Sequence, residues 1–281
     1  MTLQGEPSIW ETTVLDPGAV LLTDKVALIT GAARGIGKAT ALAFARFGAD
    51  LALCDREADD LAQTAAEVEA IGRRVVTSVM DVRDPDATGA FVAEVVRGFG
   101  RVDILVNNAG GGFWSPFADV SAKGELALVR ENFLSVTGFI RATVPHMPEG
   151  SAIVNVTSIE AHRAGPGFAV YSAMKAAVAN LAMSLALELA PRRIRINCIA
   201  PDVIPTPGDA GLGADSGALE LPGVEPQPWP ETGHVNDCAG AALFLASNLS
   251  RFVTGSTVHV DGGTWAAGGW KAKTGRTGFT L

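Results

Sequence analysis

The chain has 281 residues, of which 48% are hydrophobic and 19% are charged, and its formal net charge is −8. This composition excludes a disordered chain and indicates a compact, well-buried protein. Because binding to nucleic acid or to anionic lipid needs a basic surface, the acidic balance also argues against both kinds of partner.

Seven short β-rich runs alternate with helix-like stretches along most of the chain. The runs lie at 26–30, 50–54, 74–78, 104–106, 152–156, 195–199 and 257–260. The helix-like stretches lie at 36–47, 57–71, 85–98, 124–146, 170–190 and 235–247. This order predicts an α/β protein of the doubly wound Rossmann class, with a parallel sheet and helices on both faces.

Three segments depart from this alternation and set the predicted domain boundaries. Residues 1–22 look like an N-terminal arm, and 264–281 like a C-terminal tail rich in glycine. Between them, 23–263 form a single catalytic domain. Within it, 201–233 hold seven of the 15 prolines and no lysine or arginine, which predicts a long loop that covers a substrate.

The cellular location is predicted from the absence of a leader sequence and of a membrane span. No basic and apolar leader precedes the first strand, and no apolar run approaches the roughly 20 residues of a membrane span. The three cysteines are Cys54, Cys198 and Cys238, and they show no metal-binding spacing. We therefore expect reduced thiols, no metal site, no membrane contact and a cytoplasmic protein.

A glycine-rich turn joins the first strand to the first helix. Its sequence is Thr30-Gly31-Ala32-Ala33-Arg34-Gly35-Ile36-Gly37. Glycines permit a tight turn and close approach of the backbone, and a helix N-terminus offers free N–H groups to a pyrophosphate. The turn therefore predicts a dinucleotide site.

The ends of the next three strands add polar groups to the same edge of the sheet. Asp55 ends the second strand, where a carboxylate binds the adenosine ribose and repels a 2′-phosphate, which favours NAD over NADP. Arg34 and Arg56 flank it and partly offset this repulsion. Asp81 and Val82 follow the third strand, and Asn107-Asn108-Ala109-Gly110 follows the fourth.

Tyr171 is the one tyrosine of the chain, and Lys175 lies four residues later on a predicted helix. This spacing places both side chains on one helix face. An ammonium nearby, together with an oxidised nicotinamide, favours the phenolate and so lowers the phenol pKa from about 10. Ser158 ends the fifth strand, where its hydroxyl can hold a substrate oxygen close to the phenol.

In combination, these motifs resemble those of the short-chain dehydrogenase/reductase family, over residues 24–263. The resemblance implies a seven-stranded sheet in the order 3-2-1-4-5-6-7 and hydride transfer between a nicotinamide cofactor and a carbonyl or alcohol carbon. It implies that Tyr171 is the acid/base, that Ser158 polarises the substrate oxygen, and that Asn132 holds a water in the proton relay. Lys175 would lower the phenol pKa and bind the nicotinamide ribose.

The resemblance also implies that Asp81 and Val82 contact adenine and that Ile204 and Thr206 bind the carboxamide of nicotinamide. One position departs from the family pattern. Asp202 stands where the family usually has a glycine after Pro201. We expect Asp202 to adopt the left-handed backbone conformation that this turn needs, because aspartate tolerates that conformation.

The substrate is predicted from charge and aromatic content. Residues 196–250 carry seven acidic residues and no lysine or arginine, which disfavours a polyanionic acyl carrier. Phe113, Trp114 and Trp229 could line an apolar cleft. We expect a neutral, hydrophobic or cyclic secondary alcohol or ketone. Arg130 and Arg163 keep open an NADPH-dependent 3-oxoacyl-thioester reductase that acts on an acyl carrier protein.

Two further alternatives stay open, a non-catalytic dinucleotide sensor and an epimerase or lyase that uses the same tyrosine.

The helix from Ala176 to Leu187 contains no charged residue, so its outer face is expected to meet another subunit. The family commonly forms homotetramers through this helix, and a homotetramer or homodimer is therefore predicted.

Overall fold

The structure is a computed structural model that describes residues 15–209 and 223–281. Its centre is a seven-stranded parallel sheet in the order β3-β2-β1-β4-β5-β6-β7, which confirms the predicted topology. The strands are β1 Val26–Thr30, β2 Asp50–Asp55, β3 Val75–Val79, β4 Ile104–Asn107, β5 Ala152–Val156, β6 Arg195–Pro201 and β7 Thr257–Val260. Every strand lies within two residues of its predicted run at each end.

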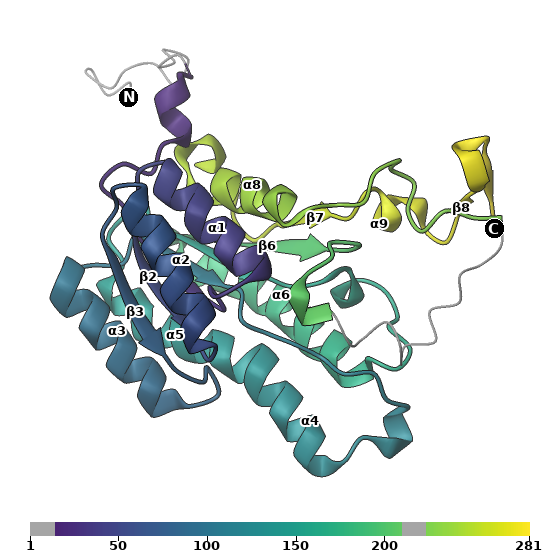
Figure 1. Ribbon diagram of the computed structural model, residues 1–281, viewed down its shortest axis with the longest axis horizontal. Helices are drawn as coiled ribbons and strands as arrows, with labels where there is room; N and C mark the ends of the chain where they lie inside the picture. The colour runs from purple at the N-terminus through teal and green to yellow at the C-terminus, as the bar shows by residue number, and fades with distance from the viewer. Residues whose placement is uncertain (1–14, 210–222) are drawn as a thin grey trace, which may run out of the picture.

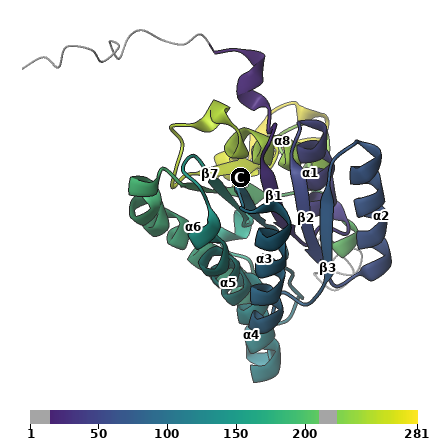
Figure 2. The same cartoon turned by 90° about the vertical axis from the view of Figure 1, so that its left-hand side faces the viewer.

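Helices cover both faces of the sheet, in two layers that share no buried core residue (Figures 1 and 2). On one face lie α1 Gly35–Arg46, α2 Ala58–Ala70 and α8 Val235–Ala246. On the other lie α3 Pro85–Phe99, α5 Ser135–Thr143 and α6 Ala169–Leu189. Alternate residues of β1 serve the two cores, with Ile29 in the first and Leu28 in the second, because successive side chains of a strand point to opposite faces.

The stretch predicted as one helix over 124–146 is interrupted. It consists of α4 Ala122–Val129, a π-helical turn over Arg130–Leu134, α5 and a final 3₁₀ turn over Val144–His146. The π turn contains Asn132, whose side chain is completely buried. Such turns insert an extra residue into a helix and often occur at functional sites.

Helix α6 corrects one expectation from the sequence. Residues 169–192 have a mean hydropathy of 1.3 and could cross a membrane by length and composition alone. In this fold α6 instead packs against β5 and β6 and buries Val178, Ala182 and Ala186 in the core. Its apolar character is therefore that of a helix in a layered α/β domain.

The C-terminal segment carries short elements that were not predicted. These are α9 Thr264–Ala267 and the antiparallel pair β8 Lys271–Ala272 and β9 Phe279–Thr280. They lie at the right-hand end of the molecule in Figure 1, away from α2 and α3. The backbone of Glu225 donates to Ala272, and that of Thr274 donates to Gly223, so this segment packs on the last part of the predicted lid.

Part of the predicted arm and lid, residues 1–14 and 210–222, lies outside the described residues. Leu22, at the end of the predicted arm, is buried and donates its N–H to Phe47 at 2.7 Å. The three cysteines are buried free thiols.

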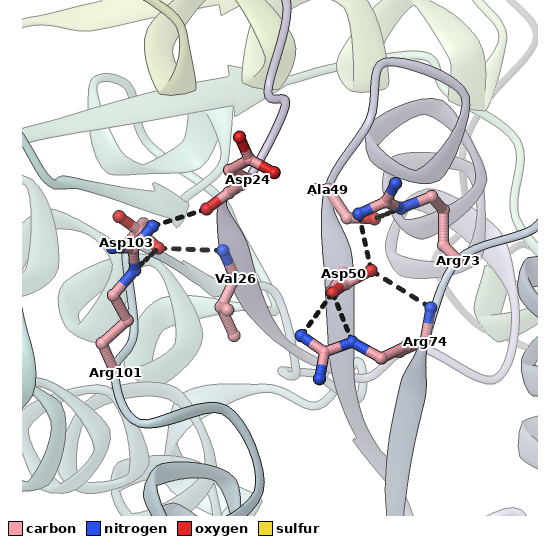
Figure 3. A network of polar contacts seen from close by, with 8 residues as sticks. All are labelled: Asp24, Val26, Ala49, Asp50, Arg73, Arg74, Arg101 and Asp103. Atoms are coloured by element: carbon pink, nitrogen blue, oxygen red, sulfur yellow. Dashed lines mark hydrogen bonds and ion pairs between the residues drawn. The ribbon is translucent and has the colours of Figure 1, made fainter.

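Two buried carboxylates hold the amino ends of the central strands (Figure 3). Asp103 accepts hydrogen bonds from the N–H of Val26 and from Arg101, both at 2.9 Å. Asp50 pairs with Arg73 and Arg74, each at 2.7 Å. These contacts fix one end of β1, β2 and β4, and the opposite, carboxyl ends of the strands are where the site lies.

Candidate active site

A pocket of about 980 Å³ follows the carboxyl ends of six strands, β1 to β6. This is the upper end of the range for ligand pockets. Its lining includes most of the site residues predicted from the sequence, namely Gly31, Arg34, Gly35, Ile36, Asp55, Arg56, Asp81, Val82, Asn108, Ala109, Gly110, Ser158, Tyr171, Lys175, Ile204 and Thr206. Gly37 and Asn132 are absent from the lining and lie directly behind it.

The glycine-rich turn is built so that only glycine fits at two positions. A Cβ at Gly37 would lie 2.0 Å from the carbonyl oxygen of Gly31, and Gly31 itself has a φ of +68°. The side chain of Asn108 donates to the carbonyls of Thr30 and Gly31, both at 3.0 Å. Asn108 therefore holds the glycine-rich turn in place. The bare turn leaves room for a pyrophosphate at the start of α1, so these residues fit a dinucleotide.

Asp55 lines the pocket at the end of β2, beside the glycine-rich turn, and backbone donors orient its carboxylate. One oxygen accepts the N–H of Ala33 at 2.9 Å, and the other accepts the N–H groups of Arg56 at 2.7 Å and Glu57 at 3.2 Å. Arg56 is drawn towards Glu57, at 3.4 Å. The carboxylate thus lies against the glycine-rich turn, where a ribose would be recognised.

Asp81 is engaged by a neighbour that the sequence did not single out. Arg83 donates to both carboxylate oxygens of Asp81 and also lines the pocket. This bonding, opposed by partial burial, holds the pKa of Asp81 below its usual value. The pair fixes this part of the pocket wall. The Asp-x-Arg spacing of Asp81 and Arg83 was the one feature of the sequence that could have predicted this ion pair, and such spacings are common in ordinary turns.

Lys175 is buried and donates from Nζ to the carbonyl of Val156, at the end of β5, at 2.9 Å. The same Nζ lies 5.5 Å from the centre of the Tyr171 ring. Burial lowers the pKa of Lys175 to about 8, while Glu131, another lining residue, opposes the change. The ring of Tyr171 also makes an edge-to-face contact with Phe168.

Asn132 lies behind Gly110 and Gly111. Its amide donates to the carbonyl of Gly111 at 2.8 Å and accepts the N–H of Gly111 at 3.2 Å. A Cβ at Gly110 would lie 2.9 Å from both Asn132 Oδ1 and Lys175 Nζ. The side chains of Asn132 and Lys175 therefore both pack against Gly110, which has no side chain of its own. Asn132 reaches this position because it lies in the π turn.

Ser158 is the N-cap of the 3₁₀ turn Ile159–Ala161, and its Oγ accepts the N–H of Glu160 at 3.2 Å. This hydrogen bond leaves the hydroxyl proton of Ser158 available to a substrate oxygen. Ser158 and Tyr171 both line the pocket, as do residues of the loops after β5 and β6.

The loop after β6 corrects the expectation for Asp202. Asp202 does not have a positive φ; Val203 does, at +53°. A β-branched residue rarely adopts this conformation, which costs about 1–3 kcal/mol. The loop then crosses the pocket, so that the side chain of Thr206 lies 3.4 Å from the position of a Cβ at Gly35.

Of the three aromatic residues proposed for the substrate cleft, Phe113 lines the pocket. Trp114 contacts Gly167 instead, and Trp229 is 61% exposed and lies outside the lining. Phe168, which sequence reasoning missed, supplies a further aromatic wall beside Tyr171.

A family model described as enoyl-(acyl carrier protein) reductase matches residues 31–264. Among curated relatives, an uncharacterised oxidoreductase of Mycobacterium tuberculosis is 38% identical over 245 residues, which cover 86% of this chain and 92% of the relative. The chain belongs to the short-chain dehydrogenase/reductase family. It is therefore an oxidoreductase that acts on CH–OH groups.

Relatives within this family differ in the substrate they are named for. Cyclohexanol dehydrogenase of Rhodococcus sp. is 37% identical over 262 residues, covering 86% of this chain and 96% of the relative. The 3-oxoacyl-[acyl-carrier-protein] reductase of Thermotoga maritima is 36% identical over 244 residues, covering 86% and 98%.

Solved structures with the same fold hold either nicotinamide cofactor. Carveol dehydrogenase from Mycobacterium avium, in complex with NAD, has a TM-score of 0.81 and 33% identity, over 87% of this chain and 99% of that one. A short chain dehydrogenase from Burkholderia cenocepacia, in complex with NADP, has a TM-score of 0.78 and 32% identity, over 86% and 98%.

Proposed function

We propose that this protein is an NAD-dependent oxidoreductase that interconverts a neutral, hydrophobic secondary alcohol and its ketone, with Tyr171 as the acid/base. The observation that carries the proposal is the convergence of Ser158, Tyr171 and Lys175 in a pocket whose other end contains Asp55. The domain from 23 to 263, with the lid at 201–233, is the unit we expect to perform the reaction.

Asp55 supports NAD as the cofactor. Its carboxylate is held by three backbone N–H groups, so it cannot turn away from a 2′-phosphate without losing them. Arg34 and Arg56 line the same end of the pocket and are the groups that would favour NADP. The carboxylate is less exposed than either arginine, which gives its charge more effect on a bound ribose.

A nicotinamide cofactor held by Gly31, Asp55 and Lys175 would supply the hydride chemistry at the alcohol or ketone carbon. Tyr171 Oη takes the proton of the alcohol in oxidation and gives it back in reduction. Ser158 Oγ donates a hydrogen bond to the substrate oxygen. Lys175 stabilises the phenolate and, through the cluster with Asn132 beside Gly110, connects Tyr171 to a path for protons.

The side chains beside Tyr171 support an apolar substrate. Phe168 contacts Tyr171, and Phe113, Leu128, Val203 and Ile204 line the same pocket. Two of the similar proteins, the cyclohexanol and carveol dehydrogenases, are named for cyclic alcohols. A cyclic secondary alcohol is accordingly the substrate class that we propose.

The second candidate is an NADPH-dependent 3-oxoacyl-thioester reductase, which is favoured by the Thermotoga maritima relative. The surroundings of Arg163 weigh against it. Arg163 is paired with Glu160 at 3.0 Å and with Asp202 at 3.3 Å, so its charge is already neutralised and does not attract an acidic carrier protein.

We further propose a cytoplasmic homotetramer. Met183 and Leu187, on the uncharged stretch of α6, are 50% and 79% exposed in the single chain. Covering these side chains with a second subunit would remove apolar surface from water.

A panel of cyclic secondary alcohols and ketones, assayed by NADH and NADPH absorbance, tests the function. We expect turnover of a cyclic substrate with NAD(H) in preference to NADP(H). A strong preference for NADPH together with an acyl thioester would favour the second candidate. An epimerase or lyase would convert substrate with no net change in NADH absorbance.

A further inference from the structure

Arg163 forms a link between two loops that border the reactive end of the pocket. Its Nη2 donates to Glu160 Oε1 at 3.0 Å and to Asp202 Oδ2 at 3.3 Å. Glu160 belongs to the loop after β5, and Asp202 to the loop after β6. These two acidic residues are distant in sequence, and both line the main pocket.

In the loop after β5, Arg163 binds Glu160, the residue whose backbone N–H orients the hydroxyl of Ser158. The backbone N–H of Glu160 donates to Ser158 Oγ, and the N–H of Ala161 donates to the carbonyl of Ser158 at 3.0 Å. Arg163 holds the side chain of the same glutamate. A movement of Arg163 would therefore be transmitted to the hydroxyl that faces the substrate.

On the second side, the link holds the start of a strained segment. The N–H of Asp202 donates to the carbonyl of Val260 at 3.1 Å, which is the last backbone contact between β6 and β7. The next residue, Val203, has a left-handed conformation with a φ of +53°. A segment in such a conformation persists only where its surroundings hold it.

The Arg163–Asp202 pair is partly removed from solvent. The side chains are 36% and 19% exposed, whereas those of the Arg193–Glu149 pair are 79% and 63% exposed. Burial raises the pKa of Asp202, and the charge of Arg163 opposes that rise. Removing one partner of a pair shielded in this way is expected to cost more than removing one partner of an ordinary surface pair.

We propose that Arg163 is a positioning residue, which through Asp202 fixes the loop that carries Ile204 and Thr206 relative to Ser158. The inference rests on the proposed function, since it takes these two residues to border the nicotinamide. It also gives a physical reason for aspartate at a position where the family pattern has glycine. The carboxylate supplies an anchor that glycine lacks.

The test is a double-mutant cycle on NADH affinity, measured by fluorescence titration of the full chain. Arg163→Met removes the guanidinium and keeps the aliphatic stem, and Asp202→Asn removes the charge at constant shape. We expect each single variant to bind NADH about threefold to tenfold more weakly, and the double variant to bind no more weakly than the worse single variant. Glu149→Gln, which breaks the exposed pair, serves as the matched control and should leave affinity unchanged.

A second measurement does not depend on the cofactor. Hydrogen exchange of the apo protein should show faster exchange in 202–206 for Arg163→Met than for the wild type, with unchanged exchange in β1 and β4. Unchanged exchange in 202–206, or additive losses of NADH affinity in the cycle, would overturn the proposal. If wild-type protein binds no nicotinamide nucleotide while exchange in 202–206 still responds to Arg163→Met, the link stands and the proposed function fails.

Discussion

The ammonium of Lys175 donates to the carbonyl of Val156 at 2.9 Å, in a position that burial has removed from water. The pKa of this lysine is lowered to about 8 from an ordinary value of 10.5. The fold therefore holds a charged side chain at neutral pH at the expense of stability. Such a group is retained where its charge has a function, which in the proposed reaction is the stabilisation of a phenolate on Tyr171.

Replacing Lys175 by methionine should change how stability depends on pH. Between pH 8 and 10.5 the unfolded chain binds the lysine proton and the folded protein does not, so the free energy of unfolding of the wild type rises with pH in this window. Relative to Lys175→Met, we expect the wild type to gain about 2 kcal/mol between about pH 7.5 and 9.5. Urea denaturation of both proteins at the two pH values measures this difference.

The comparison with Lys175→Met cancels the titration of all other groups. A difference in unfolding free energy that stays constant with pH would show that Lys175 has an ordinary pKa in the folded protein. If the wild type instead lost stability relative to the variant as the pH rises, the pKa of Lys175 would be raised by folding and not lowered.

Asp55 is expected to set the choice between the two nicotinamide cofactors. Asp55→Asn keeps an oxygen that can accept from the N–H of Ala33, and it removes the charge that repels a 2′-phosphate. We expect the ratio of NADPH to NADH affinity to rise about tenfold, which corresponds to about 1.4 kcal/mol. Fluorescence titration with both reduced cofactors gives the ratio.

Asp59→Asn is the control for this experiment, because it removes the same charge from an exposed position in the first turn of α2, outside the pocket. If both variants change the ratio equally, the net charge of the surface, and not Asp55 itself, determines the preference.

Asp103 is expected to matter for stability alone. Asp103→Ala leaves the buried N–H of Val26 without its acceptor and breaks the contact with Arg101 (Figure 3). It also breaks the ion pair with Lys25. An unpaired buried donor costs about 1–3 kcal/mol, and we expect a loss of that size in urea denaturation. Because Asp103 precedes β4 at the end remote from the pocket, the affinity for NADH should not change. A weakened affinity would mean that the two ends of the sheet are coupled.

The regular part of the fold could be predicted because its signals are local. Short β-rich runs, most of them apolar, mark each strand from β1 to β7, and the glycine-rich turn marks the start of α1. The π turn at Arg130–Leu134 could not be predicted, since one extra residue in a helix does not disturb the apolar pattern enough to be seen. The strand order itself came from the family resemblance.

Other parts of the site depend on contacts between segments distant in sequence. The pairing of Arg163 with Asp202 joins two loops, and nothing in either loop alone specifies the other as its partner. The positive φ at Val203 is likewise imposed from outside, because valine disfavours it and aspartate, one residue earlier, tolerates it better. The sequence analysis therefore predicted the left-handed conformation at Asp202, the residue that tolerates it better, whereas it occurs at Val203.

The most direct test of the proposed chemistry is the turnover of Tyr171→Phe with NAD and a cyclic secondary alcohol that the wild type oxidises. The variant lacks only the phenol oxygen and keeps the ring that packs against Phe168. We expect kcat to fall by about 10²–10⁴-fold, with NADH affinity and thermal stability close to those of the wild type. Turnover that persists at a substantial fraction of the wild-type rate would contradict the assignment of Tyr171 as the acid/base.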